Sequence, residues 1–186
     1  KNGSSNIFKI DLKTSAILQI TSGMYDKTDA NISSDGKYLY YSQESQVGEG
    51  IEYDISKMNL ENKKTEKIIS LSGDQRYPFI TEDGKYLYFV SDSDGVRDIY
   101  RYSDNGEIER ITKIVGGNYG PRITKDGLKM AFASFENGQK HIYLMDFDKY
   151  SEDLGKSVID NQTQKCIQNT IVYSGIRNDN LSSKSI

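Results

Sequence analysis

The sequence has few of the residues that build disulfides and metal sites. Its 186 residues include one cysteine, one histidine, two prolines and no tryptophan. Cys166 has no second cysteine with which to form an internal disulfide. Together with His141 it cannot supply the four thiolate and imidazole ligands of a structural zinc site. Neither metal-dependent folding nor a cofactor is therefore expected.

Long apolar runs and an excess of positive charge are also missing. No apolar run approaches the length of about 18 residues that a membrane span needs, and residues 1–6 are too polar for a signal peptide. Lys and Arg number 24 against 27 Asp and Glu, so the chain has no basic surface for phosphates and no nucleic-acid partner is expected. The length fits one domain. Because the sequence opens on Lys1, it can be a processed chain or a piece of a longer product.

What the sequence does contain is a repeat. Residues 33–42, 81–91 and 124–134 share an Asp-Gly pair followed by an apolar stretch, and their Asp residues stand 48 and 43 residues apart. A second motif keeps the same period, and its copies begin at Ile7, Ile55, Ile99 and Ile142. This spacing lies around the period of about 40–50 residues that is typical of four-stranded propeller blades.

Each repeat can be interpreted as four strands. The Asp-Gly pair forms a tight turn in which Gly takes a positive φ. The stretch after it, such as Tyr86–Val90, is apolar at consecutive positions, which indicates a strand covered on both faces. A polar loop, Asp92–Gly95, then leads to a third strand at Asp98–Tyr102 and a fourth at Glu107–Thr112. The fold class predicted is all-β, a β-propeller of four-stranded antiparallel blades.

About four blades are visible in the single predicted domain. The repeats are expected near 1–22 (a half blade), 23–72, 73–113, 114–160 and 161–186 (a degenerate half blade). Two interpretations stay open: the half blades combine to close a four-bladed ring, or the chain is part of a larger propeller. A short helix competes with strand structure only at 149–165.

The repeat resembles that of the TolB-like, WD40-like (PD40) propeller family over about residues 5–148. Pro78 and Pro121 each stand five residues before the Asp of the turn, and Ser91–Gly95 matches the family's Ser-Asp-x-Asp-Gly loop. The resemblance implies a bacterial protein that is exported, periplasmic or on the cell surface, and that contacts other proteins.

Few residues suggest chemistry. Asp92, Asp94 and Asp98 invite a calcium site, but they lack the Glu of an EF-hand loop, so a hairpin loop with Asp98 solvated is preferred. His141 is interpreted as a residue near a strand end, not a base, and Cys166 as a small core residue instead of a reactive thiol. No catalytic, cofactor-binding or metal-binding residue is predicted.

Tyrosines cluster in the strands. Because strand periodicity accounts for them, we expect packing between blades, with hydroxyls at the rim, instead of a platform for stacking a ligand. The residues concerned are Tyr38, Tyr40, Tyr41, Tyr86 and Tyr88.

The predicted function is therefore a non-catalytic interaction module that binds a protein or peptide partner, an inference from architecture. Contacts are expected at the loop tips Gln43–Gly50 and Glu136–Gln139, with the extra residues of the first repeat in a loop around Glu44–Glu52. The alternative is the propeller domain of a serine peptidase resembling prolyl oligopeptidase, which would need a Gly-x-Ser-x-Gly elbow downstream. A polysaccharide lyase would need clustered His and Arg, which a single His opposes.

Overall fold

The computed structural model describes residues 3–113 and 116–147, which hold thirteen β-strands in four antiparallel sheets. The first sheet pairs β1 (Phe8–Ile10) with β2 (Ile17–Gln19). The second contains β3 (Lys27–Ile32), β4 (Tyr38–Val47), β5 (Gly50–Asn59) and β6 (Thr65–Ile69). The third contains β7 (Gln75–Ile80), β8 (Tyr86–Ser91), β9 (Asp98–Ser103) and β10 (Ile108–Arg110). The fourth contains β11 (Asn118–Ile123), β12 (Lys129–Glu136) and β13 (Gln139–Asp146).

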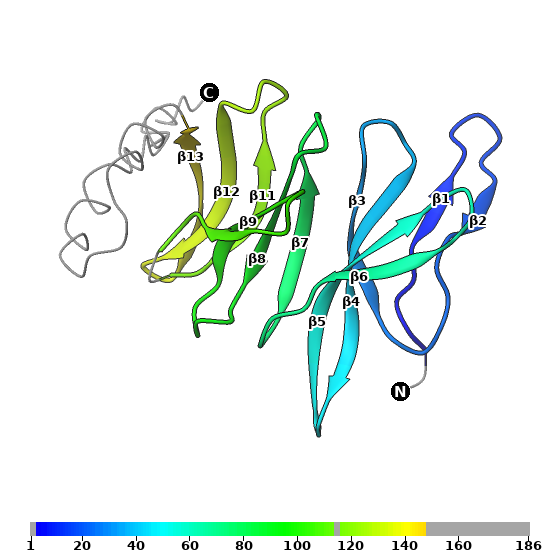
Figure 1. Cartoon of the computed structure of the whole chain (residues 1–186), viewed down its shortest axis with the longest axis horizontal. Helices are drawn as coiled ribbons and strands as arrows, with labels where there is room; N and C mark the ends of the chain where they lie inside the picture. Colours follow the sequence, from blue (N-terminus) through cyan, green and yellow to red (C-terminus); the bar gives the residue numbers. More distant parts are fainter. Residues whose placement is uncertain (1–2, 114–115, 148–186) are drawn as a thin grey trace, which may run out of the picture.

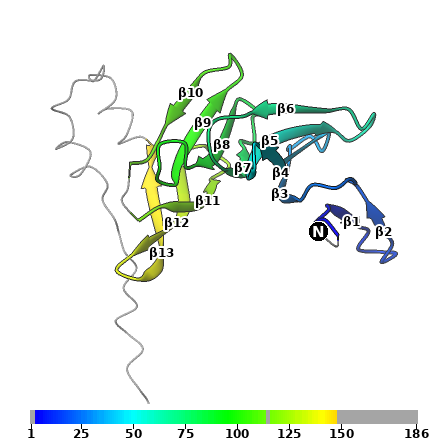
Figure 2. The same cartoon turned by 90° about the horizontal axis from the view of Figure 1, so that it is seen from below.

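The sheets follow one another side by side along the molecule (Figure 1), and within each sheet the strands are neighbours in chain order. Among the first strands, β7 contacts both β3 and β11, so the three form the inner edge around which the sheets fan out (Figure 2). The predicted all-β propeller of four-stranded antiparallel blades is confirmed. The fourth strand of the repeat at 114–160, the half blade at 161–186, the possible helix at 149–165 and Cys166 lie outside the described residues.

The Asp-Gly turns have the predicted geometry. Gly36, Gly84 and Gly127 have φ values of 71°, 74° and 75°, where a side chain would be strained. In each turn Oδ1 of the preceding Asp accepts a hydrogen bond from the backbone N–H two residues later. Together with a bond from a Ser or Thr hydroxyl, this holds the pKa of each turn carboxyl below its ordinary value.

A bulge interrupts each first strand at the same place. The register shifts just before the second half of β3, β7 and β11, and the residues there with positive φ are Asp29, Tyr77 and Gly120. The residue that follows in β7 and β11 is a fully buried proline, Pro78 or Pro121. A bulge kinks the strand and leaves a residue unpaired, which suits proline, because proline has no N–H for the ladder.

The core lies between neighbouring sheets. We call the contact between the β3–β6 and β7–β10 sheets the first interface, and that between β7–β10 and β11–β13 the second interface. Tyr40 lies in the first and Tyr88 in the second, both buried, with Tyr38 and Tyr86 half-buried beside them. Tyr41 is buried against the β1–β2 side. The prediction that these tyrosines pack between blades is confirmed.

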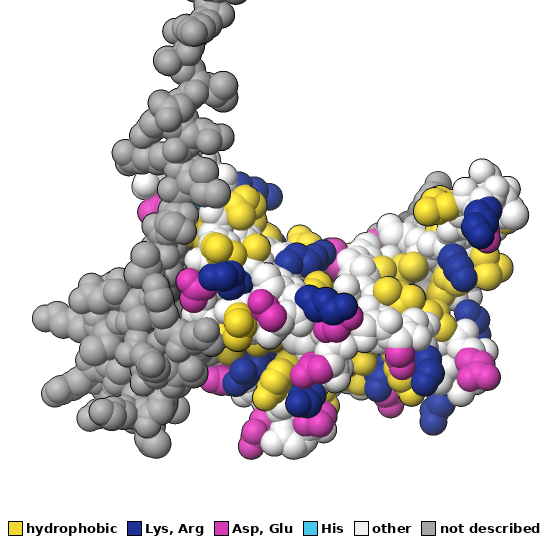
Figure 3. Space-filling view, turned by 90° about the horizontal axis from the view of Figure 1, so that it is seen from above, with side chains coloured by type: hydrophobic (Ala, Val, Ile, Leu, Met, Phe, Trp, Pro, Cys, Tyr) yellow, Lys and Arg dark blue, Asp and Glu magenta, His cyan; other side chains and the backbone are white. Residues whose placement is uncertain are grey.

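The β1–β2 sheet turns an apolar face outward. Phe8, Ile10 and Ile17 are all more than half exposed, and hydrophobic side chains gather at this end of the molecule in Figure 3. Ile7 and Ile20, which flank the two strands, pack on the β3–β6 sheet. Lys9 and Leu18, on the opposite face, are exposed as well, so both faces of this sheet are open among the described residues.

Candidate interaction surfaces

The predicted long loop of the first repeat is a β-ribbon. β4 and β5 stay paired from Tyr38 opposite Asn59 to Val47 opposite Gly50, so the turn is reduced to residues 48–49. In Figure 1 the ribbon extends past the corresponding ends of the other sheets. The prediction of a loop at Gln43–Gly50, with the extra residues in it, was wrong. Because the ribbon extends beyond the core, its strands need no alternation of apolar and polar residues. Its polar sequence therefore resembles that of a loop.

The base of the ribbon is fixed by buried carboxylates. Asp54 forms an ion pair with Lys67 at 2.5 Å and accepts a hydrogen bond from the Ser45 hydroxyl at 2.6 Å. Burial raises the pKa of Asp54, but these bonds outweigh it and hold the pKa below its ordinary value. At the tip Val47 and Ile51 expose about half of their surface, 51% and 57%. The ribbon therefore presents apolar side chains on a rigid support.

Beside the ribbon lies a row of tyrosine rings and cationic groups. The Arg76 guanidinium lies 3.9 Å from the centre of the Tyr53 ring and 2.7 Å from Asp29. Desolvation disfavours its charge, yet Asp29 outweighs this and raises the pKa of Arg76. The rings of Tyr77 and Tyr119 meet edge to face at 6.5 Å.

The row continues across the next sheet. Two cations lie over the Tyr119 ring: Arg97, with its guanidinium carbon 5.6 Å from the ring centre, and Lys140, with its ammonium at 5.0 Å. Arg97 is 39% exposed, so the row is open to solvent. We call this set the tyrosine–cation row; its members are Tyr53, Arg76, Tyr77, Arg97, Tyr119 and Lys140.

The three Asp residues considered for calcium do not converge. Asp98, predicted to be solvated, is fully buried at the start of β9 and accepts hydrogen bonds from Thr112 and Asn118 at 2.9 and 3.1 Å, as well as from Arg110. That prediction was wrong because the next sheet's first strand packs over this position. Asp92 accepts from the Asp74 N–H, and Asp94 from the Tyr100 hydroxyl.

In residues 3–113 and 116–147, no group of three or more His, Cys, Asp or Glu side chains is arranged to hold a metal ion. His141 lies in β13 opposite Ser134, is exposed, and meets the Tyr143 ring edge to face at 6.4 Å. It is thus a residue near the start of a strand, as predicted. Within the same ranges no helix is long and apolar enough to cross a membrane.

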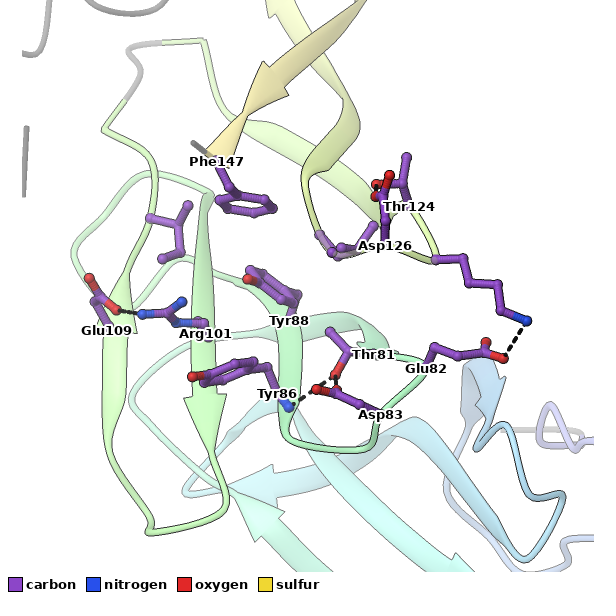
Figure 4. A pocket seen from close by; sticks show the side chains of 14 residues that line it. Thr81, Glu82, Asp83, Tyr86, Tyr88, Arg101, Glu109, Thr124, Asp126 and Phe147 are labelled. Carbon is purple, nitrogen blue, oxygen red and sulfur yellow. Dashed lines mark hydrogen bonds and ion pairs between the residues drawn. The ribbon is translucent and has the colours of Figure 1, made fainter. Parts of the chain in front are cut away.

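The second interface contains a cavity that the sequence did not predict (Figure 4). It has a volume of about 690 Å³ and lies between the Asp-Gly turns of the two sheets, at the end away from the ribbon. Arg101 is ion-paired with Glu109 on one wall, and Lys125 spans to Glu82 at 3.2 Å on the other. The sequence gives no signal for this cavity, because the residues that line it belong to turns and strands that recur in every repeat.

Comparison with solved structures places this architecture among known proteins. TolB from Acinetobacter baumannii is 28% identical with a TM-score of 0.66, over 77% of this chain and 35% of that one. A putative TolB from Agrobacterium tumefaciens is 24% identical with a TM-score of 0.68, over 80% of this chain and 55% of that one. The β-propeller domain of the Trilobed protease from Pyrococcus furiosus is 16% identical with a TM-score of 0.53, over 69% and 41%.

No protein-family model matches the sequence, and no curated protein sequence matches it. The four-stranded antiparallel sheets and these structural matches define the chain as a β-propeller protein. Within that class it is TolB-like. The chain spans 35% and 55% of the length of the two TolB structures.

Proposed function

We propose that this chain is a non-catalytic interaction module that binds a protein or peptide partner through the ribbon and the tyrosine–cation row. The observation that carries the proposal is the row itself. Tyrosine and arginine are enriched among the residues that dominate the binding energy of protein interfaces, because both combine a large flat contact area with a polar or charged group. Here they are placed side by side at one end of the first strands, where rigid sheets hold them.

The ribbon adds to this surface. Its tip carries Val47 and Ile51 with the exposed Glu49 and the half-buried Glu52 beside them, and the segment between Gln43 and Ile55 has no Lys or Arg. An apolar contact with acidic surroundings favours a partner segment that is apolar and basic. The TolB-like architecture supports a protein partner and a location in the bacterial envelope, since that is the role the family resemblance implies.

A photo-crosslinking experiment tests the proposal. A benzophenone amino acid is placed at Ile51 on the ribbon or at Tyr119 in the row, in the full gene product expressed in its own cells. A matched probe at Glu61, in the β5–β6 turn at the opposite end of the sheet, is the control. We expect one adduct of defined mass from the first two positions, and its loss when Arg97→Ala is added.

An adduct that forms equally at Glu61, or none at Ile51 and Tyr119, would contradict the proposal. The intact mass of the native gene product tests the peptidase alternative. A product that continues into a hydrolase domain with a serine elbow would make this chain a substrate gate. A product made only of further blades would leave the interaction module.

A further inference from the structure

The β1–β2 sheet exposes a face that the other sheets bury. In the repeat, Ile10 of β1 corresponds to Met58 of β5 and Met145 of β13. Met58 and Met145 are buried, because each packs on the sheet that precedes its own along the chain. Ile10 is 56% exposed, and Ile17, which lies opposite it and therefore on the same face, is more exposed still. The outward face of this sheet is thus the face that the repeat packs against a preceding sheet.

The β11–β13 sheet exposes the opposite face of the repeat. Ile142 of β13 corresponds to Ile55 of β5 and Ile99 of β9. Ile55 and Ile99 are fully buried in the first and second interfaces, where each packs on the sheet that follows its own. Ile142 is 72% exposed, and Leu144, two residues further along the same face of the strand, is exposed as well. This face is therefore the one that the repeat packs against a following sheet.

The two exposed faces are the two halves of one kind of contact. In each interface within the chain, the isoleucine of one sheet's third strand lies in the same cluster as the residue equivalent to Ile10 in the next sheet. These pairs are Ile55 with Tyr102 in the first interface and Ile99 with Met145 in the second. Figure 1 shows the β1–β2 and β11–β13 sheets at opposite ends of the row of sheets, so the two faces do not meet within one chain. Each chain therefore carries both halves of a further interface.

We propose that copies of this chain associate end to end, with the β11–β13 sheet of one copy packed on the β1–β2 sheet of the next. The contact buries Ile142 and Leu144 of one copy against Ile10 and Ile17 of the other, as the equivalent residues are buried inside the chain. Contiguous exposed apolar side chains of this kind mark sites of association. Because two different faces meet, the contact is heterologous, and it closes into a ring or continues as a filament.

The association goes beyond the proposed function. It uses the outward faces of the two end sheets, whereas the partner is proposed to bind at the ribbon and the tyrosine–cation row.

Sedimentation velocity of the 186-residue chain over a range of concentrations tests the proposal. We expect the average mass to rise with concentration. Ile10→Asp and Ile142→Asp should each leave the chain monomeric at concentrations where the parent associates, because either one places a carboxylate in an apolar contact. Leu18→Asp is the matched control: it makes the same change at an exposed residue of β2, on the face opposite Ile17, and should leave association unchanged.

Mixing the two monomeric variants tests the end-to-end geometry. Ile10→Asp keeps the β11–β13 face intact, and Ile142→Asp keeps the β1–β2 face intact. Equimolar mixing should therefore restore one contact and give a dimer with one copy of each variant, which cannot grow further. Contact between like faces predicts a different result, since each variant alone would then form a dimer through its intact face.

Controls for folding use near-ultraviolet circular dichroism of the tyrosines. Ile17→Asp and Leu144→Asp make the same changes at neighbouring positions of the two faces, and they replace either first variant that fails to fold.

A parent chain that stays monomeric at every concentration would overturn the proposal and leave the two faces to other segments of the same gene product. Association that survives in the folded Ile10→Asp and Ile142→Asp variants would also overturn it, as would a mixture of the two that stays monomeric. None of these results bears on crosslinking at Tyr119, so failure here leaves the interaction module standing.

Discussion

The first and second interfaces of this propeller share their buried isoleucines and phenylalanines but differ near the Asp-Gly turns. Ile55 and Ile99, Ile80 and Ile123, and Phe89 and Phe132 occupy equivalent positions in the two interfaces. Toward the turns, the Ser34 hydroxyl donates to the Glu82 carbonyl at 2.6 Å in the first interface, whereas the Lys125–Glu82 ion pair spans the second. Tyr102 in the first interface corresponds to Met145 in the second. The repeat therefore conserves what holds the sheets together and lets vary what borders solvent.

The largest expected effect on stability concerns the phenylalanines that the two interfaces share. Phe89 and Phe132 are almost fully buried and stack on Tyr100 and Tyr143. Phe89→Ala should lower the free energy of unfolding by about 4 kcal/mol, and Phe132→Ala by about 3 kcal/mol, because an interface beside an existing cavity can relax more easily. Urea unfolding monitored by circular dichroism measures both. A larger loss for Phe132→Ala would break the comparison.

Buried carboxylates at equivalent positions should differ next. Asp98→Ala leaves Thr112 and Asn118 buried without their acceptor and should cost about 3 kcal/mol. Asp54→Ala releases Lys67, which is 47% exposed and regains water, so the loss should be about 1 kcal/mol. The same unfolding measurement applies, with Asp35→Asn as a control in an exposed turn. Equal losses would show that the partner's exposure does not decide the cost.

The exchange of Tyr102 for Met145 can be reversed in both directions. Met145→Tyr puts a larger ring at a buried, packed position and should lower the free energy of unfolding by about 1 kcal/mol. Tyr102→Met should open the first interface and lower the free energy of unfolding by a similar amount. Thermal unfolding followed by circular dichroism compares the pair. An unchanged or raised free energy of unfolding for Met145→Tyr would mean that the second interface has room for a ring.

Alkaline pH tests the buried tyrosines of the two interfaces. Burial raises the pKa of Tyr40 and of Tyr88 above 10.0, although Arg101 opposes this at Tyr88. In the unfolded chain these phenols ionise at their ordinary pKa. The stability they contribute is therefore complete below pH 10.0 and is lost as the pH rises through the folded pKa. Tyr40→Phe and Tyr88→Phe should each make the free energy of unfolding less dependent on pH in this range. An unchanged slope would contradict the assignment.

The Lys125–Glu82 ion pair and the Ser34–Glu82 hydrogen bond should contribute least to stability. Lys125 is 84% exposed and Glu82 about half exposed, so Lys125→Ala should change the free energy of unfolding by no more than about 0.5 kcal/mol. Ser34→Ala should cost a similar amount by removing one hydrogen bond. Measurement at low and high salt separates the two, because only the ion pair is screened.

Much of the fold could be predicted because each repeat carries local sequence signals for its turns and strands. The Asp-Gly pairs fix the turns by a φ that glycine tolerates, and consecutive apolar residues such as Tyr86–Val90 mark a strand covered on both faces. These are local signals, and they needed no knowledge of neighbouring sheets. The buried tyrosines followed from the same periodicity.

The parts that sequence reasoning missed depend on neighbouring sheets. Asp98 is polar, but the burial of its carboxylate is set by Asn118 of the next sheet, 20 residues away. The ribbon was missed because pairing between β4 and β5 does not need an apolar face. The cavity is lined by residues of two sheets, such as Tyr88 on one side and Thr124 and Phe147 on the other, so it is visible only once neighbouring sheets are placed together.

The ribbon has a consequence for how the repeat can change in length. From the first paired residue to the last, the β4–β5 hairpin spans 22 residues, Tyr38–Asn59, whereas Tyr86–Ser103 and Lys129–Asp146 each span 18. The difference of four places two additional residues on each side of the hairpin. Growth in matched pairs preserves which side chains face each side, whereas a single inserted residue in one strand would flip every residue beyond it. The hairpin can therefore lengthen or shorten by matched pairs of residues while the rest of the sheet keeps its structure.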